Sequence, residues 1–269
     1  MTRPARRTRR TLHVTGTATA ALLALSACSS PGSGSGSAPD ASARLSGTVT
    51  VFAAASLQES FTTLGRKFEK AHPGTEVTFN FGGSDTLAAN ITAGAPADVF
   101  AAASTTTMAI VTDGQDNATT PVTFARNQLE IATLPGNPDT IASLQDLTRP
   151  GLKVVLCDRT VPCGAAAQKA LDASGIELTP VSYEQDVKGA LTKVELKEAD
   201  AAVVYRTDVH TAGDKVEGVD FPESADAVND YPITLLKDAP NAEAAKAFIA
   251  LVRSTEGRRV LSEAGFLAP

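Results

Sequence analysis

Short apolar runs alternate with amphipathic stretches along most of this chain. The run at 48–52 is rich in Val and Thr, which favour strands, and the apolar positions after it are three or four residues apart, as in a helix. The same pattern predicts further strands at 76–81, 98–102, 128–134, 152–157 and 201–205. It predicts further helices at 86–93, 104–112, 164–173, 186–198 and 242–264. Because apolar strands that are each followed by a helix indicate parallel sheets covered on both faces, we expect an α/β protein.

The first 27 residues have the pattern of a signal peptide. Five arginines precede an apolar stretch at 17–27 that contains no acidic residue and is too short to span a bilayer stably. The stretch ends in Leu-Ser-Ala-Cys, which resembles the lipobox of bacterial lipoproteins. We therefore expect residues 1–27 to be removed and Cys28 to carry a lipid.

A segment without core-forming residues follows the leader. Residues 29–43 are almost entirely Ser, Gly, Ala and Pro, a composition typical of a flexible tether. We expect the tether to span 28–45 and the folded part to begin at Ser46. The protein would then be exported and anchored by lipid to the outer face of the cytoplasmic membrane.

Removal of the leader makes the chain strongly acidic. The formal net charge of the whole chain is −6, and loss of the five leader arginines leaves nineteen basic against thirty acidic residues, a net charge of −11. Nucleic-acid phosphates require clustered Lys and Arg. We therefore expect no nucleic-acid partner.

The two remaining cysteines lie close together in the sequence. Cys157 and Cys163 share one short segment of a chain that we expect to be exported, which favours a structural disulfide. Redox catalysis would prefer a closer Cys-x-x-Cys pair, and a metal would need more ligands than this neighbourhood offers. We expect neither a metal cation nor a cofactor.

Two serines stand where a predicted strand gives way to a helix. Ser56 follows the first strand, with Glu59 three residues later as in a capping box, and Ser84 follows Gly82-Gly83 after the second strand. Either serine alone is explained as a helix cap. A hydroxyl can also donate to an anion, and ligands gather where parallel strands end and helices begin. The recurrence favours an anion site.

Four motifs follow one another along the chain: Val-Phe-Ala-Ala-Ala-Ser-Leu at 51–57, Gly-Ala-Pro-Ala-Asp-Val-Phe at 94–100, Asp-Val-Lys-Gly-Ala-Leu at 186–191 and Ala-Val-Val-Tyr at 202–205. In sequence and in order they resemble the periplasmic molybdate-binding proteins of ABC transporters. The resemblance implies the two-lobed type II periplasmic-binding-protein fold, each lobe a mostly parallel sheet flanked by helices. With crossings expected near 124–127 and 205–208, the first lobe would combine 46–125 with 207–269, and the second would span 126–206.

The resemblance also implies the ligand set. The hydroxyls of Ser56 and Ser84, the amides of Cys163 and Val187 and the phenol of Tyr205 would hold molybdate or tungstate between the lobes. The partner would be an ABC permease, and we expect a monomer. Every one of these contacts is a neutral donor. Asp85, beside Ser84, would repel a dianion unless its side chain turned away to cap its helix or face solvent.

Other functions remain open at this point. Sulfate is a smaller tetrahedron than molybdate, and phosphate keeps a proton near neutral pH that would lack an acceptor among donors alone, at a cost of about 1–3 kcal/mol. A hydrolase using Ser56, Ser84 or Cys163 as nucleophile would need a nearby base. After loss of the leader only His72 and His210 remain, and we expect both at the surface. A scaffold lipoprotein is a third class.

Overall fold

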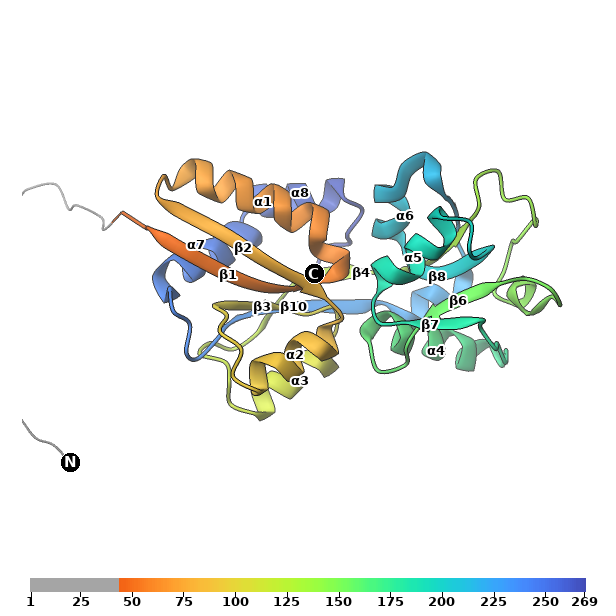
Figure 1. Ribbon diagram of the computed structural model, residues 1–269, viewed down its shortest axis with the longest axis horizontal. Coiled ribbons are helices and arrows are strands. Elements are labelled where there is room, and N and C mark those ends of the chain that lie inside the picture. The colour runs from red at the N-terminus through yellow and green to blue at the C-terminus, as the bar shows by residue number, and fades with distance from the viewer. Residues whose placement is uncertain (1–43) are drawn as a thin grey trace, which may run out of the picture. The chain divides into compact units, whose positions relative to one another are not determined.

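The computed structural model describes residues 44–269, which form two lobes, each built on a five-stranded sheet (Figure 1). The expected leader and Cys28, with most of the expected tether, lie outside the described residues. Within residues 44–269, no helix combines the length and the apolar character needed to cross a membrane.

The sheet of the first lobe has the strand order β2-β1-β3-β10-β4. β1 is parallel to β2 and β3, whereas β10 is antiparallel to β3 and β4. The strands are β1 (Gly47–Ala54), β2 (Thr75–Gly82), β3 (Val99–Ala101), β4 (Val122–Asn127) and β10 (Asn229–Leu235). The helices are η1 (Ala55–Leu57), α1 (Gln58–Ala71), α2 (Ser84–Thr92), α3 (Thr105–Asp113), α7 (Ala242–Arg253) and α8 (Thr255–Glu263).

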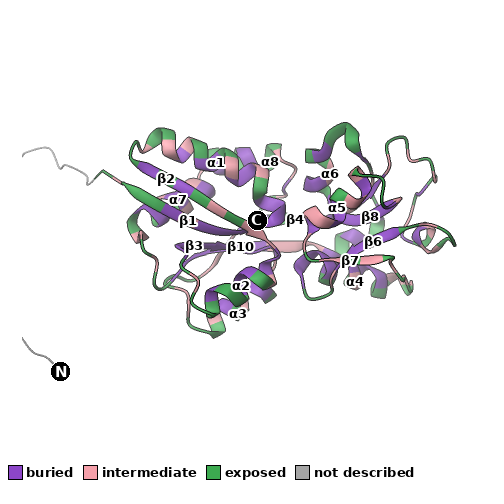
Figure 2. Cartoon of the chain, viewed as in Figure 1, coloured by how far each residue is buried: buried purple, intermediate pink, exposed green. Residues whose placement is uncertain are grey.

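Helices cover both faces of this sheet. Along β1 the side chains alternate between faces, so that Val51 and Ala53 join the core under α1, α7 and α8, while Phe52 joins the core under α2 and α3 (Figure 1). β1 and β3 are buried along most of their length (Figure 2). This burial on both faces explains why these strands read as continuous apolar runs.

The sheet of the second lobe has the order β7-β6-β8-β5-β9. β6 is parallel to β7 and β8, whereas β5 is antiparallel to β8 and β9. The strands are β5 (Leu129–Thr133), β6 (Val154–Cys157), β7 (Ser182–Glu184), β8 (Ala201–Tyr205) and β9 (Glu217–Val219). The helices are η2 (Gln145–Thr148), α4 (Pro162–Ser174), α5 (Val187–Glu195), α6 (Arg206–Ala212), η3 (Gly213–Lys215) and η4 (Pro222–Ala227).

The chain crosses between the lobes at two neighbouring points. The first crossing is at Gln128, between the end of β4 and the start of β5, close to the expected position. The second comes where the chain enters β10 at Asn229. Asn127 and Asn229 are partners in the β4–β10 ladder, so the crossings lie side by side.

The structure differs from the expected return crossing at 205–208. β9 pairs with β5, and α6 packs against β5 and β8, so residues 206–228 stay with the second lobe. The reason is apolar burial, because Val216, Phe221 and Ala227 complete the core of that lobe.

The expected α/β architecture in two lobes is confirmed, but the sheets are mixed rather than mostly parallel. Half of the strand pairings in each sheet are antiparallel: β10 with β3 and β4 in the first lobe, and β5 with β8 and β9 in the second. Three of these strands, β4, β9 and β10, were not predicted from the sequence. The single helix expected at 242–264 is two helices, because Ser254 ends α7 and caps α8 by accepting from the Gly257 amide at 3.1 Å.

Candidate functional site

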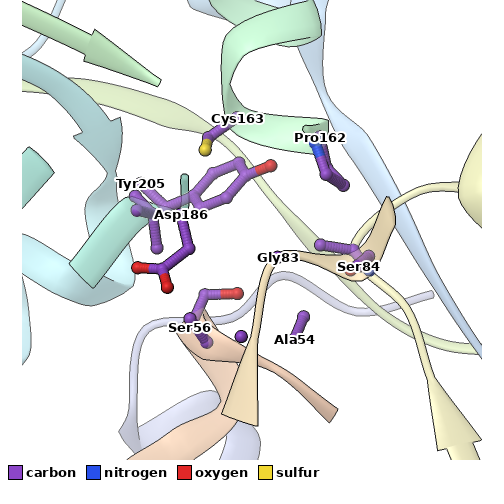
Figure 3. Close-up of a pocket in the computed structure, with 12 residues that line it drawn as sticks. Ala54, Ser56, Gly83, Ser84, Pro162, Cys163, Asp186 and Tyr205 are labelled. Carbon is purple, nitrogen blue, oxygen red and sulfur yellow. Dashed lines mark hydrogen bonds between the residues drawn. The ribbon is translucent and has the colours of Figure 1, made fainter. Parts of the chain in front are cut away.

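A pocket lies between the two lobes, at the ends of their strands (Figure 3). The first lobe contributes Ala54, Ala55, Ser56, Gly82, Gly83, Ser84 and Ala103. The second lobe contributes Pro162, Cys163, Asp186, Val187 and Tyr205. The structure therefore brings together all five residues of the predicted ligand set.

Strand register places the two serines next to each other. β1 and β2 are parallel and end in register, with Ala54 opposite Gly82. Each strand then turns directly into a helix, so Ser56 lies in η1 and Ser84 is the first residue of α2. Both serines are almost fully buried. The first-turn amides of these helices have no intrahelical acceptor. A ligand in the pocket could therefore accept from these N–H groups as well as from the two hydroxyls.

Two helix starts form the wall of the second lobe. Cys163 lies in the first turn of α4 after Pro162, and Val187 is the first residue of α5. The amides in these positions have no carbonyl one turn earlier to bond. A disulfide between Cys157 and Cys163 confirms the expected pairing and joins the end of β6 to the start of α4. Because the sulfur of Cys163 is in that bond, the backbone amide is the group that remains for a ligand.

Each of the three hydroxyls already has a protein partner. The Ala103 amide donates to Ser84 Oγ at 3.0 Å, and Asn229 Nδ2 donates to the Tyr205 hydroxyl at 2.6 Å. Ser56 Oγ lies 2.8 Å from the hydroxyl of Tyr231. Burial raises the pKa of both Tyr205 and Tyr231 well above the usual value of a phenol. Both phenols are therefore neutral and hold their protons at physiological pH.

The only charged group that lines the pocket, among the described residues, is the carboxylate of Asp186. It is the N-cap of α5, and its Oδ1 accepts from the Gly189 amide at 2.9 Å. The sequence interpretation had singled out Asp85 instead. Asp85 does not line the pocket, and its side chain neither caps α2 nor faces solvent fully, because its Oδ1 is buried without a hydrogen-bond partner among residues 44–269.

The nearest ammonium group is neutralised by two carboxylates. Lys188 Nζ lies 2.9 Å from Glu59 Oε1 on the first lobe and 3.2 Å from Asp208 Oδ1 on the second. Burial lowers the pKa of Lys188, but the pairing with Asp208 and Glu59 outweighs it and holds this pKa above its usual value. Burial also raises the pKa of Asp208 to about 6, against the lowering effect of Lys188. An anion in the pocket would therefore meet dipoles and the Asp186 carboxylate, and no free cation among the described residues.

The two histidines among residues 44–269 both lie outside this pocket. His72 follows the last residue of α1 and stacks on Phe68, with 4.6 Å between ring centroids. His210 is an exposed residue of α6. Neither lines the pocket, so Ser56, Ser84 and Cys163 have no histidine partner there.

Sequence reasoning missed four residues that lie at or behind this site: Asn127, Asp186, Asn229 and Tyr231. The signal for two of them was present, since Asn229 and Tyr231 are two residues apart and would share a face if a strand had been predicted there. Asp186 was quoted only as part of a motif. Asn127 is fully buried at the end of an unpredicted strand.

Comparison with known proteins places these features in context. The family of bacterial extracellular solute-binding proteins matches residues 49–267. The Molybdate-binding protein ModA of Mycobacterium tuberculosis is 46% identical over 222 residues, covering 82% of this chain and 85% of that protein. The protein of the same name from Escherichia coli is 32% identical, covering 82% of this chain and 89% of its own length. The solved periplasmic molybdate-binding protein of Azotobacter vinelandii shares the fold, with a TM-score of 0.72 at 19% identity, covering 82% of this chain and 99% of that chain.

Proposed function

Because this chain belongs to the bacterial extracellular solute-binding proteins, we propose that it captures molybdate or tungstate for the permease of an ABC importer. The observation that carries the proposal is the interlobe pocket, in which three hydroxyls and several helix-start amides face one space. The 46% identity to a protein named for molybdate binding supports the choice of anion.

The donor set suits a tetrahedral dianion. Helix N-termini carry a partial positive charge and unpaired N–H groups, and α2, α4 and α5 all begin at the pocket. Hydrogen bonds to a charged acceptor are about twice as strong as neutral ones. A protein with an acidic surface can therefore hold a dianion without a cationic side chain in contact.

The same donor set disfavours hydrogen phosphate. Its proton would need an acceptor, and the one lining carboxylate among the described residues, Asp186, is held as the N-cap of α5, with Oδ1 accepting from the Gly189 amide and Oδ2 as the only acceptor left to it. An unpaired buried proton donor costs about 1–3 kcal/mol, or about tenfold to a hundredfold in affinity. Sulfate satisfies the donors equally well, so its rejection would depend on its smaller size.

We further propose that the protein binds and releases its ligand without covalent chemistry, as a monomer. Closing of the lobes would exclude water and present a recognisable form to the permease. A signal peptide at 1–27, a lipid on Cys28 and a tether at 28–45 would keep the protein at the outer face of the cytoplasmic membrane.

Titration calorimetry against molybdate, tungstate, sulfate and phosphate tests the proposal. We expect tight binding of the first two anions and a rise in melting temperature with each, because a ligand at about one hundred times its Kd adds about 2.7 kcal/mol to the free energy of unfolding. Tight phosphate binding without a molybdate signal would refute it. Turnover of ester or phosphoester substrates would favour a hydrolase instead, and a melting temperature that no anion changes would favour a scaffold.

A further inference from the structure

A hydroxyl is not inherently a donor, because its oxygen can also accept. Ser56, Ser84 and Tyr205 could each turn a lone pair toward the pocket and accept the proton of hydrogen phosphate. Selection of a fully deprotonated anion therefore requires that something fix the direction of these protons. The described residues behind the pocket provide such a device for all three hydroxyls.

Ser84 is the simplest case. The Ala103 amide, 3.0 Å away, can only donate, so Ser84 Oγ must accept from it. Ser84 is 1% exposed, and its oxygen has no other hydrogen-bond partner among residues 44–269. Its own proton is therefore left for a ligand.

The direction of the Tyr205 hydroxyl proton is fixed in a similar way, by the side-chain amide of Asn229. Asn229 Nδ2 lies 2.6 Å from the Tyr205 hydroxyl, and also 3.0 Å from the carbonyl oxygen of Ala103 and 3.3 Å from that of Pro162. Because two carbonyl oxygens can only accept, the atom facing them must be the NH₂ group. Its two hydrogens are shared among these three oxygens, and because an NH₂ group cannot accept, the Tyr205 proton must point away from Asn229.

The direction of the Ser56 hydroxyl proton is fixed through two further residues, Asn127 and Tyr231. The Gln128 amide donates to Asn127 Oδ1 at 3.0 Å, which fixes the amide orientation. Asn127 Nδ2 then faces Thr207 Oγ1 at 2.8 Å and the Tyr231 hydroxyl at 3.3 Å. Tyr231 is fully buried, and Asn127 Nδ2 cannot accept its proton. The hydroxyl of Tyr205 also interacts with that of Tyr231, but Ser56 Oγ at 2.8 Å is the acceptor within hydrogen-bond distance, so Tyr231 donates to Ser56. The Ser56 proton is then free for the pocket.

We propose that Asn127, Tyr231 and Asn229 are positioning residues that hold the hydroxyl protons of Ser56 and Tyr205 toward the ligand, and so make the site select fully deprotonated oxyanions. This inference rests on the proposed function and deepens it. One lone pair of each hydroxyl is occupied and its proton is turned toward the pocket, which adds to the scarcity of carboxylates as a basis for rejecting hydrogen phosphate.

Asn127→Asp should reverse the direction of the hydrogen bonds from residue 127 through Tyr231 to Ser56, with a side chain of nearly the same shape. The new carboxylate would accept from Tyr231, Tyr231 would then accept from Ser56, and the Ser56 proton would leave the pocket. We expect molybdate Kd to rise about tenfold to a hundredfold, the value of one hydrogen bond to a charged acceptor. The matched control is Asn90→Asp, an exposed position on α2 with the same change in charge, for which we expect less than about a twofold change.

A double-mutant cycle separates this effect from simple repulsion between the introduced carboxylate and the dianion. Tyr231→Phe removes the link between position 127 and Ser56. We expect Asn127→Asp to weaken molybdate binding strongly in the wild-type background and only about twofold in the Tyr231→Phe background. Equal losses in both backgrounds would overturn the inference, because repulsion through space does not need the phenol.

Anion selectivity gives a readout that does not depend on the Asn127→Asp variant folding. Tyr231→Phe leaves Ser56 free to accept, so we expect the ratio of phosphate Kd to molybdate Kd to fall about tenfold. An unchanged ratio would overturn the inference while leaving molybdate binding by the wild type intact. A wild type that binds none of the four anions would overturn the proposed function and this inference together.

Discussion

At Gly83 the two lobes approach more closely than a side chain would allow. A Cβ atom placed on this residue would lie 2.6 Å from the carbonyl oxygen of Gln185 and 3.3 Å from Val161, both on the second lobe, and 2.7 Å from Asp85 Oδ1 on its own lobe. The Asp85 side chain can move aside, whereas the backbone carbonyl of Gln185 cannot. The backbone of Gly83 has φ of −60° and ψ of 130°, which any residue adopts. The glycine is therefore required by the contact between lobes and not by the conformation of the chain.

Gly83→Ala should weaken ligand binding without unfolding the protein. The added methyl group would hold the lobes apart, so we expect molybdate Kd to rise at least about tenfold, with a melting temperature of the ligand-free protein close to that of the wild type. Gly82→Ala is the comparison that adds a methyl group at the same pocket without a contact between lobes, since Gly82 also lines the pocket but a Cβ there would meet only Leu87 of its own lobe, at 3.9 Å. Equal losses from both variants in calorimetry would contradict this explanation.

Asp85→Asn should strengthen anion binding. The carboxylate lies one residue from Ser84 and has a buried oxygen without a partner among the described residues, so it opposes a dianion at close range. We expect a fall in molybdate Kd of about twofold to tenfold at low salt, and a smaller effect at high salt. Weaker binding by the variant would show that the carboxylate supports the site.

Among the elements, β5 carries a carboxyl group in an unfavourable position. Burial, together with the nearby Asp220, raises the pKa of Glu130 to about 7, against the lowering effect of Arg206. The folded protein therefore binds this proton at pH values where the unfolded chain has released it. Asp208, with a pKa raised to about 6 chiefly by burial, acts in the same direction.

The free energy of unfolding should therefore fall as pH rises from about 4.5 to about 7, because over this range the folded state holds more protons than the unfolded state. Glu130→Gln keeps the shape of the neutral acid and should raise the melting temperature at about pH 8 while leaving it nearly unchanged at about pH 5. Melting curves across this range would test the sign. A wild type that gains stability toward pH 8 would contradict it.

The elements also show how far sequence patterns reach. β8 was predicted with the bounds that the structure has, because all five of its residues are buried and apolar or aromatic. β10 was missed, since it opens with Asn-Asp-Tyr-Pro and shifts register between Tyr231 and Pro232. Ser56 and Ser84 were found from the pattern because each closely follows a predicted strand, whereas Cys163, Val187 and Tyr205 were assigned through the resemblance to molybdate-binding proteins. The residues behind the pocket were not found, because their role depends on partners about 100 or more positions away, such as Asn127 with Tyr231 and Ser56 with Tyr231.

At the scale of the molecule, an ion pair joins the lobes beside the pocket. Glu59 on α1 contacts Lys188 on α5 at 2.9 Å, and Lys188 also contacts Asp208 at 3.2 Å within its own lobe. Each charged residue lies one or three positions after a predicted ligand: Ser56, Val187 or Tyr205. If the lobes close on the ligand as proposed, the same helix starts would couple closing to formation of the ligand site.

Glu59→Gln should weaken molybdate binding modestly, because it removes one cross-lobe attraction from the closed form. A partly exposed pair predicts about a twofold to fivefold rise in Kd, decreasing as salt is added. Glu198→Gln is a suitable control, since its partner Lys193 lies in the same lobe. A salt-independent effect, or an equal effect from the control, would show that the pair does not act on closing.

Asn127 and Asn229 pair where the chain crosses between the lobes, and this position has a consequence for the rates at which an anion binds and leaves. Points on a rotation axis move least. Asn127, Tyr231 and Ser56 all belong to the first lobe, and the contact of Asn127 with Thr207 of the second lobe lies beside the crossings, so opening about them would leave this hydrogen-bond chain little changed. An arriving anion would then meet a Ser56 hydroxyl that is already oriented. We expect association rates to be similar for different tetrahedral dianions, and discrimination to lie in how long each one stays.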